Sequence, residues 1–228
     1  MIEFLFLDLD DTILDFHKAE HIAISKTFRE FGIEPTEEVL SRYSQINKSC
    51  WHKLELGLWD RETVLVQRFA LLFAEYGIVQ EGTPVARAYE KNLGIGHWFL
   101  PGAEEAVASL SKKYRLFLAS NGTASVQKGR MTSANLYRFF EKVFVSQELG
   151  YNKPAPEFFQ RAVAQIPGYD PEKAMMVGDS LTSDILGGIN AGIKTCWVNP
   201  KHLPADPAIP ADYEIESLSQ LEALLQTL

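Results

Sequence analysis

The stretch FLFLDLDDT, residues 4–12, is an apolar run that ends in three carboxylates and a hydroxyl. A run this short and unbroken is typical of a strand buried on both faces, as in a parallel sheet covered by helices. Its polar residues then lie at the carboxyl end of the strand, where open α/β sheets bind their ligands. Asp8 and Asp10 are two positions apart, so they point the same way on an extended chain. Because oxygen ligands suit a hard cation such as Mg²⁺, we expect a metal-assisted carboxylate site here.

The composition limits the classes of protein to consider. With 228 residues and 46% hydrophobic content, the chain can bury one sizeable core, or one core and a smaller domain. A net charge of −8 argues against nucleic acid or an anionic membrane as the main partner, but it allows a small anionic substrate. The N-terminus lacks the basic start of a signal peptide, and Cys50 and Cys196 form no paired motif. We expect free thiols, a cytoplasmic location, and a monomer or homodimer.

Residues 15–96 are predicted to form several helices and no strand. Asp60 is a suitable N-terminal cap, Gly77 is a typical helix stop, and Pro84 fits the first position of a further helix. From residue 97 the pattern changes to short apolar strands that alternate with helices. Such alternation predicts a parallel sheet with right-handed crossovers. We therefore predict an α/β fold with a core of residues 1–14 and 97–228, and an all-helical insertion of residues 15–96.

Polar clusters recur where three of the predicted strands end. They are Asp8, then Ser120-Asn121-Gly122, and finally Gly178-Asp179-Ser180. Parallel strands present these ends on one edge of the sheet, so distant residues converge on one site. Each cluster also has a simpler interpretation, because Asp, Ser, Asn and Gly are common in turns. Lys153 alone resembles a surface lysine, but Pro154 follows it and stiffens its loop.

Taken together, these side chains favour phosphoryl transfer. Asp8 can attack phosphorus and form an acyl phosphate, and Asp10 can protonate the leaving group and then deprotonate water. Ser120, Asn121 and Gly122 can direct a hydroxyl, an amide and backbone N–H groups at phosphate oxygens.

The charged residues complete this predicted site. Lys153 would limit the repulsion of carboxylates near Asp8 and bind the phosphate. Asp179 ends a strand and can complete the metal site. Asp184 falls in the first turn of a helix, and we expect it to support the metal ligands from behind.

These stretches resemble, in order, the four motifs of the haloacid dehalogenase (HAD) superfamily. The first motif is residues 8–12, the second Ser120-Asn121, the third Lys153 and the fourth residues 178–184. The resemblance implies a Rossmann-like core with a helical cap inserted just after the first motif. It also implies that Mg²⁺ is held by Asp8, Asp179 and the backbone carbonyl of Asp10.

The residue at position 10 separates branches of this superfamily. The dehalogenase branch lacks an acid there and needs no metal, so Asp10 points to phosphate chemistry. The cap is similar to that of the pyrimidine 5′-nucleotidase-like phosphatases, in residues 54–59 and in the turn at Asn121. The resemblance thus implies a phosphomonoesterase acting on a nucleoside 5′-monophosphate, with Asp11 and Thr12 among its substrate-binding residues.

Other functions stay open at this point. A sugar-phosphate phosphatase or a phosphosugar mutase would share the same core. A receiver-like domain that signals through a phosphorylated aspartate is a further alternative, although a large cap counts against it.

Two further patterns carry weaker signals. Residues 17–21, HKAEH, match the H-x-x-E-H string of a class of zinc peptidases, but no third ligand can be identified. We interpret this stretch as the polar start of the first inserted helix, from which His17 or His21 could still face the site. Trp51, Trp59 and Trp98 could stack on a nucleobase or pack inside the cap.

Overall fold

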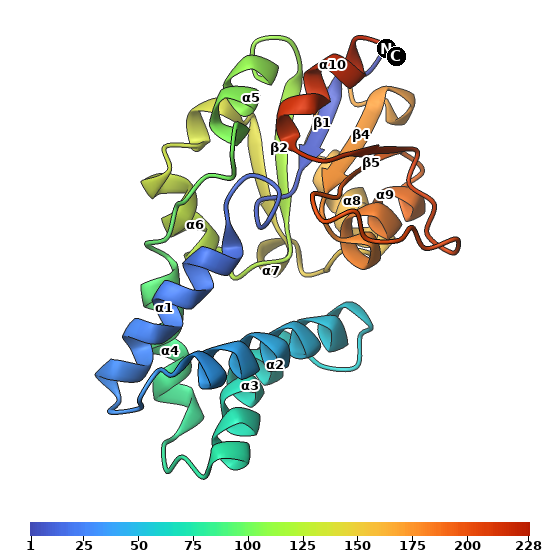
Figure 1. The fold of residues 1–228 in the computed structure, drawn as a ribbon. Coiled ribbons are helices and arrows are strands. Elements are labelled where there is room, and N and C mark those ends of the chain that lie inside the picture. The colour runs from blue at the N-terminus through green and yellow to red at the C-terminus, as the bar shows by residue number, and fades with distance from the viewer.

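The computed structural model describes all residues from 1 to 228. Six strands form one parallel sheet in the order β3-β2-β1-β4-β5-β6, with helices on both faces (Figure 1). The strands are β1 (Phe4–Leu7), β2 (Arg115–Ser120), β3 (Lys142–Val145), β4 (Ala174–Gly178), β5 (Lys194–Val198) and β6 (Tyr213–Ile215). The predicted α/β class and its parallel sheet are confirmed.

Strand β1 lies at the centre of the sheet, hydrogen-bonded to β2 on one side and to β4 on the other. All of its residues are buried. Leu5 and Leu7 belong to a hydrophobic cluster on one face of the sheet, whereas Phe4 and Phe6 belong to a cluster on the other face. The apolar run is therefore a strand covered on both sides, as predicted.

The two faces are covered by different helices. The face of Leu5 is covered by α5 (Ala103–Leu110), α6 (Ala124–Ser133) and α10 (Leu221–Leu225). The face of Phe6 is covered by α7 (Ser146–Leu149), α8 (Pro156–Val163) and α9 (Leu186–Asn190). The single turn of α7 was not predicted, because four residues are too few to show a helical period. This arrangement leaves the carboxyl ends of β1, β2 and β4 together at one edge of the sheet.

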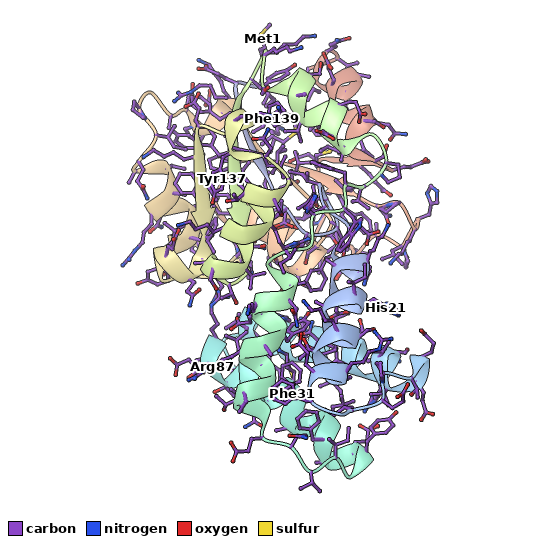
Figure 2. The ribbon with its side chains drawn as sticks, turned by 90° about the vertical axis from the view of Figure 1, so that its left-hand side faces the viewer. Met1, His21, Phe31, Arg87, Tyr137 and Phe139 are labelled. Atoms are coloured by element: carbon purple, nitrogen blue, oxygen red, sulfur yellow. The ribbon has the colours of Figure 1, made fainter.

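Four helices form the cap beyond this edge (Figures 1 and 2). They are α1 (Phe16–Glu30), α2 (Glu37–Glu55), α3 (Arg61–Tyr76) and α4 (Gly82–Leu93). Their apolar faces enclose a second hydrophobic cluster, which Val126 of α6 joins and in which the rings of Tyr43 and Phe69 lie 5.2 Å apart. The all-helical cap inserted after the first strand is confirmed.

The helix ends of the cap follow most of the predicted signals. The Asp60 carboxylate accepts a hydrogen bond from the backbone N–H of Thr63 at 2.7 Å, and Gly77 ends α3 with a left-handed φ of 64°. The prediction that Pro84 opens its helix was wrong, because α4 begins at Gly82. Pro84 is the third helical residue, where a backbone N–H would still have no partner within the helix.

The two ends of the chain lie together at the end of the molecule opposite the cap (Figure 1). No helix combines the length and the apolar character needed to cross a lipid bilayer. Cys50 and Cys196 are both buried and unpaired.

Candidate active site

Asp8 is the first residue after β1, and only 7% of it is exposed. Its Oδ1 accepts a hydrogen bond from the Lys153 ammonium at 2.8 Å, and its Oδ2 accepts one from the backbone N–H of Asp10 at 2.9 Å. Burial, followed by the nearby carboxylates of Asp184 and Asp10, raises the pKa of Asp8 to about 8, although Lys153 opposes this shift. Asp8 is thus fixed in position and poorly solvated, and Lys153 is the group that favours its charged, nucleophilic form.

Lys153 is completely buried, and its ammonium contacts three oxygens. They belong to Asp8, to Asp184 at 2.6 Å, and to the backbone carbonyl of Ala119. Burial alone would lower the pKa of Lys153, but the two carboxylates outweigh it and raise the pKa above its ordinary value. The ammonium therefore stays charged and links the first, third and fourth motifs.

Asn121 holds the backbone of Lys153 in place. Its side-chain amide donates to the Lys153 carbonyl, and its side-chain oxygen accepts from the Lys153 N–H, both at 2.8 Å. We predicted that Asn121 would face phosphate oxygens. In the structure its side chain instead joins the loop after β2 to the loop that carries the lysine.

Three carboxylates gather at this edge of the sheet. Ligand oxygens of Asp8, Asp179 and Asp184 all lie within 4.8 Å of one another. Burial and the neighbouring acids raise the pKa of Asp179 well above its usual range. Three acids with one ammonium among them leave an excess of negative charge, and an all-oxygen donor set suits Mg²⁺. The residues present therefore fit a hard divalent cation.

The surroundings of Asp179 and Asp184 differ. Asp184 accepts from Lys153 through Oδ1 and from the backbone N–H of Ser180 through Oδ2, so both of its oxygens are already engaged. The backbone carbonyl of Asp179 accepts a hydrogen bond from the buried Trp197 indole at 2.8 Å. The Asp179 carboxylate has no protein donor, which leaves it available to a cation.

Asp10 is held by two residues that the sequence analysis missed. The guanidinium of Arg130 pairs with Asp10 Oδ1, and the side-chain amide of Gln127 donates to Asp10 Oδ2 at 2.7 Å. Both residues belong to α6, three positions apart, and both are buried. The one available signal was that residues 124–133 lack the continuous apolar stripe expected of a helix packed on a sheet.

Ser120 and Gly122 belong to the loop after β2, which lies beside Gln127. The Ser120 hydroxyl oxygen accepts from the Gly122 N–H at 3.1 Å and from the Gln127 amide at 2.8 Å. A Cβ at Gly122 would lie 2.3 Å from the Gln127 amide nitrogen, so glycine is needed there to make room for Gln127. The loop after β2 thus faces α6 as well as the carboxylates.

Asp11 and Thr12 lead from β1 toward the cap. Asp11 has a left-handed φ of 54°, and its Oδ1 accepts from the backbone N–H of Phe16 at 2.9 Å. Its Oδ2 lies 3.5 Å from Nε2 of His17. The predicted substrate-binding carboxylate is therefore engaged with the start of α1, whereas the Thr12 hydroxyl is buried without a partner.

The H-x-x-E-H stretch does not form a metal site. Glu20 points into the cap, where it accepts from Ser44 and Asn47, each at 2.6 Å. His21 instead lies 3.4 Å from Glu37. The interpretation as the polar start of a cap helix is confirmed.

Two cap residues reach the core at the edge that carries the carboxylates. Arg61, the first residue of α3, donates to the backbone carbonyls of Asn121 (2.8 Å) and Gly122 (3.0 Å), and to side-chain oxygens of Ser146 and Asn152. Glu55, the last residue of α2, accepts from the Thr182 hydroxyl at 2.9 Å. We call these contacts of Arg61 and Glu55 the cap–core seam.

The tryptophans have different surroundings. Trp51 is half-buried, and its ring lies 5.5 Å from the guanidinium of Arg61 at the seam. Trp59 lies under the Lys53 ammonium at 3.9 Å, within the cap. Trp51 is therefore the one whose ring lies beside a residue that contacts the core loops.

Comparisons with known proteins agree with this geometry. A sequence model of the family described as haloacid dehalogenase-like hydrolase matches residues 5–198. The HAD-hydrolase YfnB of Bacillus subtilis is 37% identical over 221 residues, covering 97% of this chain and 94% of that protein. Pyrimidine 5′-nucleotidase PynA of Streptococcus pneumoniae is 37% identical over 220 residues, covering 96% and 93%. Pyrimidine 5′-nucleotidase YjjG of Escherichia coli is 29% identical, covering 98% and 97%.

A solved structure extends the match to three dimensions. The crystal structure of YfnB from Bacillus subtilis, bound to magnesium, superimposes with a TM-score of 0.94 at 36% identity and covers 98% of each chain. The fold and the carboxylate–lysine site define a hydrolase with a Rossmann-like core and a helical cap. The chain belongs to the haloacid dehalogenase-like hydrolase family, so the predicted resemblance is confirmed.

Proposed function

We propose that this enzyme is a Mg²⁺-dependent phosphomonoesterase that cleaves pyrimidine 5′-mononucleotides through an aspartyl-phosphate intermediate. The observation that carries the proposal is the buried Asp8 carboxylate, which is fixed by Lys153 and lies two residues from a second carboxylate on Asp10. A nucleophile and a proton donor placed side by side at a strand end suit phosphoryl transfer.

In the first step, an Asp8 oxygen attacks phosphorus while the bond from phosphorus to the ester oxygen breaks. The proton of the Asp10 carboxyl passes to that ester oxygen, so the nucleoside leaves as an alcohol. The Lys153 ammonium holds Asp8 in place and offsets the negative charge of the phosphoryl group. The backbone N–H groups of the loop after β2 supply further donors.

In the second step, water attacks phosphorus as the Asp10 carboxylate removes its proton. The acyl phosphate bond breaks, and Asp8 returns to a carboxylate as inorganic phosphate leaves. Asp8 and Asp179, with the backbone carbonyl of Asp10, would hold Mg²⁺, which would supply a positive charge to offset the carboxylates and the phosphate oxygens. Asp184 keeps Lys153 and the backbone of Ser180 in place around this site.

The substrate class is supported by relatives. PynA and YjjG are named pyrimidine 5′-nucleotidases, and PynA matches 96% of this chain at 37% identity. The match includes the cap, which lies over the site in this family. We infer a small phosphorylated metabolite as the partner. Because the buried thiols of Cys50 and Cys196 are unpaired, we further propose a reducing, cytoplasmic location.

We also propose that residues 15–96 move as one cap domain relative to residues 1–14 and 97–228. The hydrophobic cluster of the cap comes almost entirely from its own helices, with Val126 of α6 as the buried core residue that joins it, and at the carboxylate edge the cap contacts the core through the polar cap–core seam. The YfnB structure is described as revealing interdomain movement. Opening of the seam would admit substrate, and closing would exclude water from the acyl phosphate.

A phosphate-release screen tests the function. It should cover pyrimidine and purine 5′-monophosphates, sugar phosphates and small phosphoacids, each with Mg²⁺ and with EDTA. We expect release from pyrimidine 5′-monophosphates, only with Mg²⁺, and we expect Asp8→Asn to lower it by at least about 10³-fold because the nucleophile is lost.

The folded state of Asp8→Asn is checked by circular dichroism, with Asp15→Asn as a matched control, because Asp15 caps α1 outside the site. Near-normal turnover by a folded Asp8→Asn would contradict the covalent mechanism. Release from sugar phosphates but not from nucleotides would contradict the substrate class alone.

A further inference from the structure

We propose that Gln127 and Arg130 are positioning residues that orient the Asp10 carboxylate for proton transfer. This inference rests on the proposed function, because it assumes that Asp10 exchanges protons with the ester oxygen and with water. It adds two residues, from a helix outside the four motifs, to the reaction.

The first argument is that both oxygens of Asp10 are fixed, each by a different residue. Arg130 Nη1 donates to Oδ1, and Gln127 Nε2 donates to Oδ2 at 2.7 Å. A carboxylate held at one oxygen can still rotate, whereas one held at both cannot. Each oxygen keeps a second lone pair, so the bonds orient the group without blocking the proton that it must carry.

The second argument is the cost of burying these donors. Arg130 is 0% exposed, and Asp10 is the only carboxylate that it pairs with. Replacing buried ionic pairs with apolar residues is often neutral or stabilising, so a buried guanidinium on a helix packed against a sheet is poorly explained by stability alone. The Nη2 atom of Arg130 has no hydrogen-bond partner.

The third argument is that the surroundings are shaped to place Gln127. Gly122 has no side chain, and the space this leaves is occupied by the side-chain amide of Gln127. The same amide nitrogen donates to Ser120, so one side chain spans the distance from the loop after β2 to Asp10. Gln127 and Arg130 also contact each other, with Nη1 of Arg130 3.4 Å from Oε1 of Gln127.

A purely structural role is the competing explanation. Arg130 Nε donates to the backbone carbonyl of Gly96 at 3.0 Å, in the segment that returns from the cap. Loss of that bond could disturb the fold or the cap in any variant of Arg130. The test therefore needs a readout that responds to proton transfer and not to packing.

The leaving group supplies that readout. Cleavage of uridine 5′-monophosphate would release a strongly basic alkoxide, which needs a proton from Asp10. Cleavage of p-nitrophenyl phosphate releases p-nitrophenolate, a much weaker base that can leave without a proton. Because kcat/KM reports the steps up to ester cleavage, misplacing Asp10 should affect the two esters unequally. We expect Gln127→Leu and Arg130→Lys to lower kcat/KM about 10²-fold for the nucleotide but less than about 5-fold for the nitrophenyl ester.

Chemical rescue provides a second measurement for Arg130. In Arg130→Ala, added guanidinium can enter the vacated space and pair with Asp10, and we expect it to restore nucleotide cleavage selectively. Arg138→Ala is the matched control, because Arg138 is an exposed arginine near α6 that pairs with Glu104 on the surface. Its kinetics should equal those of the wild type for both esters.

The outcomes separate this inference from the proposed function. If the wild type cleaves both esters and the folded variants lose activity equally on both, or lose none, the positioning role is overturned while the phosphatase assignment stands. If the wild type cleaves neither ester, the proposed function falls, and the role of Asp10 falls with it. A selective loss on the nucleotide, reversed by guanidinium, supports the positioning role.

Discussion

Glu20 shows how far burial can change a single side chain of the cap. It is buried between α1 and α2, where it accepts from Ser44 and Asn47, and Asn47 in turn accepts from Arg68. Burial raises the pKa of Glu20 even though these donors favour its charged form. The carboxyl group is therefore more readily protonated in the folded chain than in the unfolded chain.

The sign of the resulting pH dependence follows from linkage. A group with a raised folded-state pKa contributes stability below its unfolded pKa, and this contribution is lost as the pH rises through the folded pKa. Glu20→Gln lacks this titration. We expect the free energy of unfolding of the wild type, relative to that of Glu20→Gln, to decrease as the pH rises above about 4, the ordinary range of a glutamate, and through the raised folded-state pKa.

Urea denaturation at several pH values measures this difference. Glu62→Gln serves as the control, since Glu62 is an exposed carboxylate on the same cap. If the stability curves of wild type and Glu20→Gln stay parallel over the whole range, Glu20 is not the titrating group that we describe.

At the same scale, the sequence could predict some residues of the site better than others. Asp8 and Ser120 follow from local rules, since each ends an apolar run and parallel strands align their ends. Gln127 and Arg130 contact Asp10 across 117 and 120 positions of sequence, and no local pattern specifies which face of α6 meets it. Asn121 was predicted near the right place but with the wrong partner, because its orientation depends on the Lys153 backbone.

At the scale of elements, the N-terminus of α3 joins the cap to the core through Arg61. Arg61 is half-buried, and this burial lowers its pKa to about 10, with Glu90 opposing the shift. Its acceptors are backbone carbonyls, a hydroxyl and an amide oxygen of the core. These bonds tie the cap directly to the loop after β2.

We predict that Arg61→Met shifts the cap toward an open position. A hydrogen bond from a charged group contributes about 1.5 to 3 kcal/mol, so kcat/KM for the nucleotide should fall roughly 10- to 100-fold. Steady-state kinetics measure this effect. Arg42→Met is the control, because Arg42 lies on the cap surface and pairs with Glu75. Unchanged kinetics in Arg61→Met would show that the seam does not govern closure.

The helices of the cap domain could be predicted from the sequence, because helix stops such as Gly77 and N-terminal capping residues such as Asp60 are local signals. The cap–core seam could not be predicted, because Arg61 and Glu55 contact loops that lie far away in the sequence. Helix boundaries depend on neighbours within a few residues, whereas contacts between domains depend on the whole fold.

At the scale of the whole molecule, negative charge is in excess at one edge of the sheet. Asp8, Asp179 and Asp184 gather at the sheet edge with Lys153 as their single buried cation. Repulsion among them opposes folding until a cation is present. Stability of the entire chain should therefore depend on the divalent cation.

We predict that Mg²⁺ raises the unfolding temperature relative to EDTA. At about 100 times its Kd, a ligand specific to the folded state adds about 2.7 kcal/mol, which corresponds to roughly 5 to 10 °C for a chain of this size. Thermal denaturation followed by circular dichroism measures this shift. In Asp179→Asn the shift should shrink, and equal unfolding temperatures with Mg²⁺ and EDTA would contradict the metal site.

The positions of Trp51 and Trp197 make them intrinsic fluorescent probes of the enzyme. Trp51 lies beside Arg61 at the seam, and both belong to the cap, so opening of the cap would move this indole ring away from the core loops that Arg61 contacts. Trp197 donates a hydrogen bond to the backbone carbonyl of Asp179, the residue whose carboxylate is free for a cation. Indole emission responds to nearby charged and polar groups, so variants that keep only Trp51 or only Trp197 of the four tryptophans would let cap motion and cation uptake be timed separately, without any added dye.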